Sequence, residues 1–177
     1  MEELRFVEAE TEDQFRAMSA IHARGWRKTY PGYVPDDYMR EVITDDHWVS
    51  IFSDNRSAGN WHGLMLCRGE VPVACCTYGA ARVQGPEGGN YPGWAELWTF
   101  YADPDETGHG YGSLLMEEAL RRLRAEGYPA CFVLVLRENE GARRFYARHG
   151  FAWDGTQVDI PFPHDMVCID LRYTQAL

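Results

Sequence analysis

The sequence predicts an α/β fold in which one mixed β-sheet carries helices on both faces. Apolar runs typical of strands alternate with amphipathic helical segments along 177 residues, an ordinary length for one domain. Residues 131–136 (CFVLVL) form a continuous apolar run, as expected of a strand buried on both faces. We therefore expect a single domain over 1–177.

The N-terminal half begins with a strand and continues with helices. Thr11 and Gln14 form a capping box, which marks a helix start, and Pro31-Gly32 interrupts the pattern that follows. The expected elements are a strand at 4–9, a helix from 11 to about 23, a loop or broken helix at 26–34, short helices near 35–36 and over 45–52, and a β-hairpin of 62–67 and 71–80.

The C-terminal half alternates strands and helices. Gly127 ends one predicted helix, and Asn139 has the residue type of a helix N-cap. The expected elements are a Gly/Pro-rich loop at 84–93, a strand at 94–102, a helix from the glycines after 107 to about 126, a strand at 131–136, a helix from 139, and strands at 151–154 and 166–173.

Composition narrows the possible partners. The N-terminus is acidic where a signal peptide would be basic, and no apolar run approaches the ~20 residues of a membrane span, so we expect a cytoplasmic protein without a membrane partner. A net charge of −10 argues against nucleic acid. The same acidity suits a cationic acceptor, or serves solubility alone. The five cysteines show no CxxC and have apolar neighbours, which predicts buried thiols and no metal site.

Three glycines follow the strand predicted at 94–102. Gly108, Gly110 and Gly112 stand between Asp103-Pro104 and a helical stretch, so the order is strand, Gly-rich turn, helix. A helix N-terminus offers unpaired N–H groups that can hold a pyrophosphate. An isolated turn of this kind is equally well a plain surface turn. Ser113 breaks the dinucleotide spacing GxGxxG, and no GxxxxGK[ST] is present.

These and further segments resemble the GCN5-related N-acetyltransferase superfamily. Residues 107–112 (TGHGYG) correspond to its acyl-CoA loop [QR]-x-x-G-x-[GA], with Thr107 in place of the leading Gln or Arg. Residues 139–151 match its second signature N-x-x-A-x-x-F-Y-x-x-x-G-F. The segment 95–104 (AELWTFYADP) is similar to the central strand, and 26–38 (WRKTYPGYVPDDY) to a substrate-side helix and loop.

The resemblance implies a mostly antiparallel sheet and acetyl-CoA as co-substrate. It implies cofactor contacts from the central strand, the loop and the second signature: Phe100, Tyr101, Ala102, Thr107, Gly108, His109, Gly110, Tyr111, Gly112, Ser113 and Asn139. The implied reaction is direct attack of a primary amine, either a small molecule or a peptide N-terminus. A homodimer is compatible with the sequence, which does not decide the oligomeric state. The alternative is a non-catalytic acyl-CoA-binding module of the same fold, which senses the cofactor or dimerises.

The chemistry of acetyl transfer to an amine determines which residue types the site needs. A lysine-like amine must lose a proton, which costs about 4.6 kcal/mol at neutral pH, and the CoA thiolate leaves more easily when protonated. Tyr146 stands where the family places the acid; the alternative is a packing role beside Phe145. Glu96 stands near the family's base, and a solvent-facing carboxylate is equally compatible. The aromatics Trp26, Tyr30, Tyr33, Trp61, Trp94 and Trp98 either wall the acceptor site or pack the core and loops.

Overall fold

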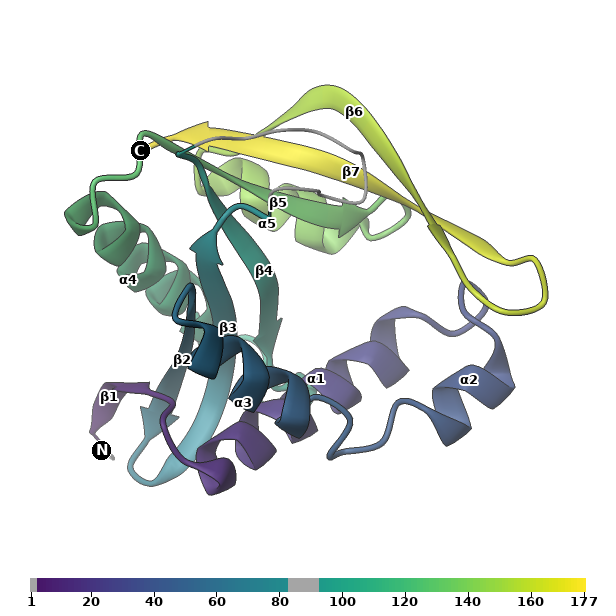
Figure 1. Cartoon of the computed structure of the whole chain (residues 1–177), viewed down its shortest axis with the longest axis horizontal. Helices are drawn as coiled ribbons and strands as arrows, with labels where there is room; N and C mark the ends of the chain where they lie inside the picture. Colours follow the sequence, from purple (N-terminus) through teal and green to yellow (C-terminus); the bar gives the residue numbers. More distant parts are fainter. Residues whose placement is uncertain (1–2, 83–92) are drawn as a thin grey trace.

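One seven-stranded sheet forms the centre of the protein (Figure 1). The computed structural model describes residues 3–82 and 93–177. The strand order is β1-β2-β3-β4-β5-β7-β6, and every neighbouring pair is antiparallel except β4 with β5. The strands are β1 (Leu4–Glu8), β2 (Trp61–Arg68), β3 (Val71–Ala80), β4 (Ala95–Ala102), β5 (Ala130–Leu136), β6 (Ala152–Pro161) and β7 (Val167–Ala176). The predicted mixed, mostly antiparallel sheet is confirmed.

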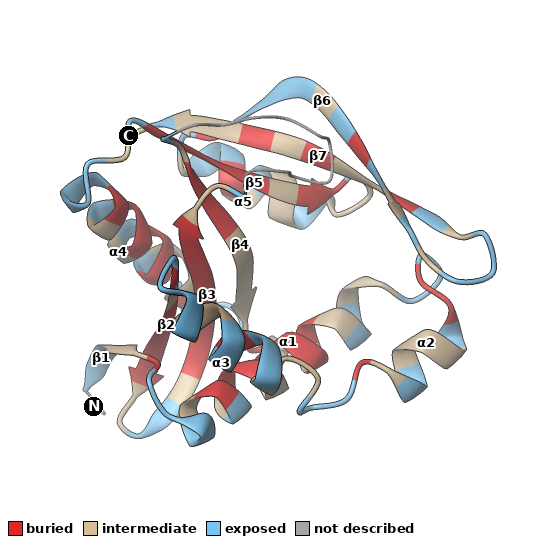
Figure 2. Cartoon of the chain, viewed as in Figure 1, coloured by how far each residue is buried: buried red, intermediate tan, exposed pale blue. Residues whose placement is uncertain are grey.

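Helices cover both faces of this sheet, as predicted. The described helices are α1 (Glu12–Thr29), α2 (Asp36–Glu41), α3 (Val49–Ala58), the 3-10 turn η1 (Pro104–Glu106), α4 (Tyr111–Ala125) and α5 (Glu140–Arg148). Buried residues of α1 and α3 pack with β2 and β3 in one core cluster, and α4 and α5 pack on the opposite face in a second cluster. Figure 2 shows the buried central strands and the exposed outer sides of the helices.

Successive side chains of β2 point to opposite faces of the sheet, so helices can pack on both faces. Leu64 and Leu66 point to the α4 side, whereas Met65 and Cys67 point to the α1 side. The five cysteines are free and buried, as the sequence predicted. Within 3–82 and 93–177, no helix is long and apolar enough to cross a bilayer, and no group of His, Cys, Asp or Glu is arranged to hold a metal ion.

Several boundaries differ from the sequence prediction. The capping box of Thr11 and Gln14 is confirmed, but α1 continues through Trp26 to Thr29, because the break occurs at Tyr30, directly before the proline. The helix expected over 45–52 begins only at Val49, after a turn in which the His47 amide bonds the Thr44 carbonyl, and it continues to Ala58.

The last strands are longer than expected. Pairing of β6 with β7 resumes after an irregularity between Trp153 and Gln157, which extends β6 from the predicted end at residue 154 to Pro161. The β7 strand likewise runs to Ala176 instead of residue 173. The loop predicted over 84–93 lies outside the described residues except for Gly93.

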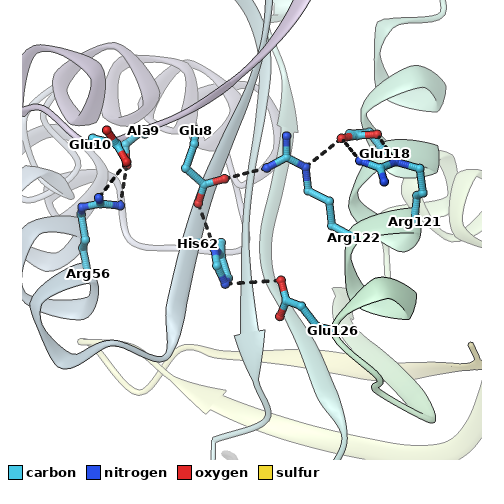
Figure 3. A network of polar contacts seen from close by, with 9 residues as sticks. All are labelled: Glu8, Ala9, Glu10, Arg56, His62, Glu118, Arg121, Arg122 and Glu126. Atoms are coloured by element: carbon cyan, nitrogen blue, oxygen red, sulfur yellow. Dashed lines mark hydrogen bonds and ion pairs between the residues drawn. The ribbon is translucent and has the colours of Figure 1, made fainter.

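A charge network fastens α4 to the strands at the β1 edge of the sheet (Figure 3). Arg122 on α4 donates to Glu8 on β1 at 2.7 Å and to Glu118, one turn earlier, at 2.8 Å. The other oxygen of Glu8 lies 2.9 Å from Nδ1 of His62 on β2, and Glu126 lies 3.5 Å from Nε2 of the same ring. These contacts fix the orientation of α4, whose N-terminus belongs to the site described next.

Candidate active site

The parallel strands β4 and β5 separate halfway along β4. Their pairing covers only Ala95 to Leu97, opposite Cys131 to Val133, whereas β4 remains paired with β3 as far as Ala102. The β3–β4 register shifts between Thr77 and Tyr78, so that Trp98 is skipped. Figure 1 shows β5 diverging from β4 beyond this point. From residue 98 onward, the β5-facing edge of β4 is therefore released from sheet pairing and can bind another extended group.

The glycine loop and the start of α4 lie beside the released part of β4. Gly108 has φ +86° and Gly110, the N-cap of α4, has φ +76°, a left-handed conformation that favours glycine. A Cβ built at either position would find no atom within 4 Å. The first turn of α4 contains no acidic residue, so its amide groups present the positive end of the helix dipole to an open space.

Two arginine–carboxylate pairs hold the segment that leads into this loop. Arg68 on β2 donates to both oxygens of Glu106 at 2.8 and 2.9 Å. Arg24 on α1 donates through Nε to Asp103 at 3.3 Å, and Asp103 accepts the amide of Asp105 at 3.1 Å. Burial raises the pKa of Asp103, but Arg24 and this amide outweigh burial and hold the pKa below its usual value. The loop is thus anchored to β2 and to α1.

A cavity of about 580 Å³, here named the loop cavity, opens between this loop, β4 and α5. All residues predicted from the sequence to bind the cofactor line it, except His109, which stacks on Tyr111 with ring centroids 5.3 Å apart. Asn139 also caps α5 by accepting the Ala142 amide at 3.1 Å. Two cations in its lining, Lys28 and Arg148, were not predicted.

A second cavity of about 380 Å³, here named the aromatic cavity, lies toward α1 and the β6–β7 hairpin. Its walls include Trp26, Tyr30, Trp48, Trp98 and Phe162. Trp26 stacks on Tyr30 with centroids 4.3 Å apart and meets Phe162 edge-on at 6.3 Å. Of the aromatics considered from the sequence, Trp26, Tyr30 and Trp98 line this cavity, whereas Trp61 packs in the core.

Tyr146 lies in the wall that the two cavities share. It comes from α5, is only 6% exposed, and lines both the loop cavity and the aromatic cavity together with Phe100, Tyr101, Asn139 and Ala142. Burial raises the pKa of Tyr146, and the neighbouring Tyr101 raises it further. The phenol therefore stays protonated at neutral pH and can donate a proton to a group in either cavity.

Glu96 lies on β4 in the wall of the aromatic cavity, 1% exposed. The alternative of a solvent-facing carboxylate is therefore wrong. Arg82 donates to Glu96 through Nε at 3.0 Å, through its backbone amide at 3.3 Å, and through a third, shorter contact from Nη2. The guanidinium also lies over the Trp98 ring, 5.3 Å from its centroid. Both oxygens of Glu96 are thus engaged by Arg82.

Asp170 on β7 is a second carboxylate of the aromatic cavity and was not predicted from the sequence. Burial, followed by the nearby charge of Glu138, raises its pKa to about 6. Its sequence signal is a single acidic residue in the apolar strand CIDL, and only the pairing of β7 with β5 brings it near Tyr146.

Fold and site together define an acyl-CoA-type transferase architecture: a split sheet, a glycine loop at a helix N-terminus, and a tyrosine between two cavities. The model of the acetyltransferase (GNAT) family matches residues 15–151. The chain belongs to this family. No curated protein sequence matches the chain.

Solved structures share this fold over the whole chain. The PaiA N-acetyltransferase from Thermoplasma acidophilum, in complex with coenzyme A, has a TM-score of 0.73 and 16% identity, with 99% of each chain covered. An N-acetyltransferase from Staphylococcus aureus Mu50 has a TM-score of 0.75 and 18% identity, with 98% of each chain covered. The yncA protein from Salmonella typhimurium, with its cofactor acetyl-CoA, has a TM-score of 0.73 and 14% identity, covering 99% of this chain and 94% of its own.

Proposed function

We propose that the protein transfers the acetyl group of acetyl-CoA to a primary amine, with Tyr146 as general acid. The observation that carries the proposal is the position of Tyr146 in the wall between the loop cavity and the aromatic cavity. A thioester held in one cavity and an amine held in the other would meet at this hydroxyl. Family membership supports acetyl transfer in general.

The loop cavity fits acetyl-CoA. Open space beside Gly108 and Gly110 admits a pyrophosphate to the amide groups at the start of α4. Lys28 and Arg148 supply the positive charge that Thr107 does not. The released edge of β4, at Phe100 to Ala102, offers backbone groups to the amides of a pantetheine arm. Similar structures contain coenzyme A or acetyl-CoA.

Direct attack requires two proton movements at the shared wall. The amine nitrogen must be neutral when it attacks the thioester carbonyl carbon, because a protonated amine has no free electron pair. As the carbon–sulfur bond breaks, the Tyr146 hydroxyl gives its proton to sulfur, which makes the thiol a better leaving group. Glu96 remains a candidate proton acceptor, and its pairing with Arg82 fixes its orientation in the wall.

The aromatic cavity is the proposed acceptor site, for a small-molecule amine or a peptide N-terminus. We further propose that the enzyme is cytoplasmic and that, with its net charge of −10, it uses neither nucleic acid nor membrane as partner. The alternative function, a non-catalytic acyl-CoA sensor, shares the loop cavity but needs no proton donor between the two cavities.

A screen of primary amines with acetyl-CoA tests the proposal. Thiol release should depend on both the enzyme and the amine, and mass spectrometry should detect the acetylated amine. Binding of acetyl-CoA without amine-dependent thiol release, across aliphatic amines, arylalkyl amines, amino acids and peptides, would favour the sensor function instead.

A further inference from the structure

Asp170 has no hydrogen-bond or ion-pair partner for its carboxylate among the residues that the structure describes. Every described hydrogen bond to a carboxylate of the aromatic cavity goes to Glu96, from Arg82. Asp170 is partly buried, so its oxygens have lost much of their water without gaining a protein donor. A carboxylate in this situation costs free energy unless a cation or a donor arrives.

Among the described residues, the groups that interact with Asp170 are hydroxyl groups, a thiol and one further acid. Tyr30 on α1, Tyr101 on β4, Tyr146 on α5 and Cys168 on β7 all experience its charge. Of the charged groups that the structure describes, Glu138, after β5, adds to burial in raising the pKa of Asp170. The surrounding charge therefore favours a cation beside Asp170.

The fold places Asp170 close to the proposed acid. Asp170 pairs with Leu136, the last residue of β5, and the chain then passes through Asn139 into α5, which carries Tyr146. Both side chains line the aromatic cavity. Burial, Tyr101 and Cys76 raise the pKa of Tyr146, and the charge of Asp170 raises it further, as expected of two groups in one cavity.

The rest of the cavity determines what kind of amine fits. Its aromatic side chains form a continuous wall, since the Trp26 ring contacts Tyr30, Trp48 and Phe162. Such a wall favours an apolar or aromatic body and also stabilises a cation near it. Arg82 is the one positively charged side chain in the described lining, and it holds Glu96. An acceptor carrying a carboxylate or phosphate next to its amine finds no further cationic side chain in this part of the lining.

We propose that Asp170 binds the ammonium group of the acceptor and accepts its proton, and that the acceptor is an arylalkyl amine without an anionic group beside the nitrogen. This inference rests on the proposed acetyl transfer and identifies the substrate class of that site. One proton of the ammonium passes to Asp170, which releases it to solvent. The nitrogen then forms the bond to the acetyl carbon as the carbon–sulfur bond breaks, Tyr146 protonates sulfur, and a second nitrogen proton restores the tyrosine.

Asp170→Asn tests this role, because it keeps the size of the side chain but cannot accept the proton. Phenethylamine is the probe, and the matched control is Asp159→Asn, an exposed aspartate on the adjacent strand β6 that lines neither cavity. We expect kcat/KM for phenethylamine to fall by about 10²-fold in Asp170→Asn and to stay unchanged in Asp159→Asn. The thermal shift with coenzyme A should be the same in all three proteins.

The pH profile separates proton transfer from simple packing. In the wild type, kcat/KM should rise with an apparent pKa of about 6, the value of Asp170, and level off well below the pKa of the amine. In Asp170→Asn this limb should vanish, and the rate should follow the ionisation of the amine itself. An Asp170→Asn profile that overlays the wild type would exclude Asp170 as the proton acceptor.

A second probe keeps the test independent of the folding of the variant. The analogue of phenethylamine with two fluorines on the carbon beside the aminomethyl group has the same shape but a far less basic nitrogen. If Asp170 removes the proton, Asp170→Asn should lower kcat/KM much less for this analogue than for phenethylamine, because the analogue loses its proton without a strong base, whereas a folding defect would lower both rates equally. An equal loss for both amines would overturn the role of Asp170.

A failure of the proposed acetyl transfer can be distinguished from a failure of the role proposed for Asp170. No thiol release with any amine would remove the proposed acetyl transfer. Turnover of phenylalanine as efficient as that of phenethylamine, with phenethylamine activity unaffected by Asp170→Asn, would leave acetyl transfer intact and overturn both the assigned residue and the assigned substrate class.

Discussion

Gly110 provides the sharpest test of the loop cavity as the coenzyme A site. Its φ of +76° and the open space around it mean that Gly110→Asp adds backbone strain and a carboxylate, but no steric clash within the protein. The strain costs about 1–2 kcal/mol. The carboxylate points into the space proposed for the pyrophosphate, where like charges repel.

The expected size of the effect follows from mass action. Coenzyme A at 100 times its Kd stabilises the folded protein by about 2.7 kcal/mol. For a chain of this size, that corresponds to an increase in Tm of roughly 5–10 °C. In Gly110→Asp, the Tm without ligand should fall by a few degrees, and the increase with coenzyme A should disappear.

Gly127 supplies the matched control. It has φ +85°, also finds no atom within 4 Å of a built Cβ, and follows the opposite end of the same helix α4. Gly127→Asp should lose at least as much stability, because a carboxylate near a helix C-terminus is unfavourable. It should nevertheless keep the full coenzyme A shift in differential scanning fluorimetry. An equal ligand shift in Gly110→Asp and the wild type would refute the proposed pyrophosphate position.

Three further predictions concern buried or paired groups. Gly25→Ala should lower kcat/KM by about tenfold despite the better helix propensity of alanine, because the new Cβ would lie 2.5 Å from the Tyr101 ring; unchanged kinetics would show that the ring moves freely. Burial lowers the pKa of His22 to about 3, so the neutral ring contributes stability, of the order of 5 kcal/mol, that is present above its unfolded pKa of about 6.5 and is lost as pH falls toward 3. Urea unfolding at several pH values should show this pH dependence weakened in His22→Gln, and an unchanged dependence would contradict the assignment to His22. The hydrogen bond to Glu8 raises the pKa of His62, so the charged ring adds a smaller stability that is present below about pH 6.5 and is lost as pH rises through the raised pKa. In His62→Gln, stability should no longer fall over this pH range. An unchanged pH dependence would contradict the network in Figure 3.

Local signals in the sequence were sufficient to predict the glycine loop and the start of α5. The glycine spacing predicts a turn before a helix, and the structure gives Gly108 and Gly110 the left-handed conformation that such a turn requires. Asn139 is the N-cap that its residue type indicates. Both features depend on neighbours within a few residues, which a single sequence displays directly.

The aromatic cavity depends on contacts between distant segments and could not be predicted in the same way. The partner of Glu96 is Arg82, fourteen residues earlier, brought close by the pairing of β3 with β4. Asp170 reaches the site only because β7 inserts between β5 and β6. A single acidic residue in a strand does not reveal which face is buried or whether a cation lies opposite.

The most direct test of the proposed acetyl transfer is the kcat of Tyr146→Phe. This variant keeps the ring in the wall between the two cavities and removes only the hydroxyl group. With the best amine from the screen, the proposal predicts that kcat falls by about 10²-fold, with little change in KM and an unchanged thermal shift with coenzyme A. A Tyr146→Phe enzyme with the kcat of the wild type would contradict the role of Tyr146 as proton donor.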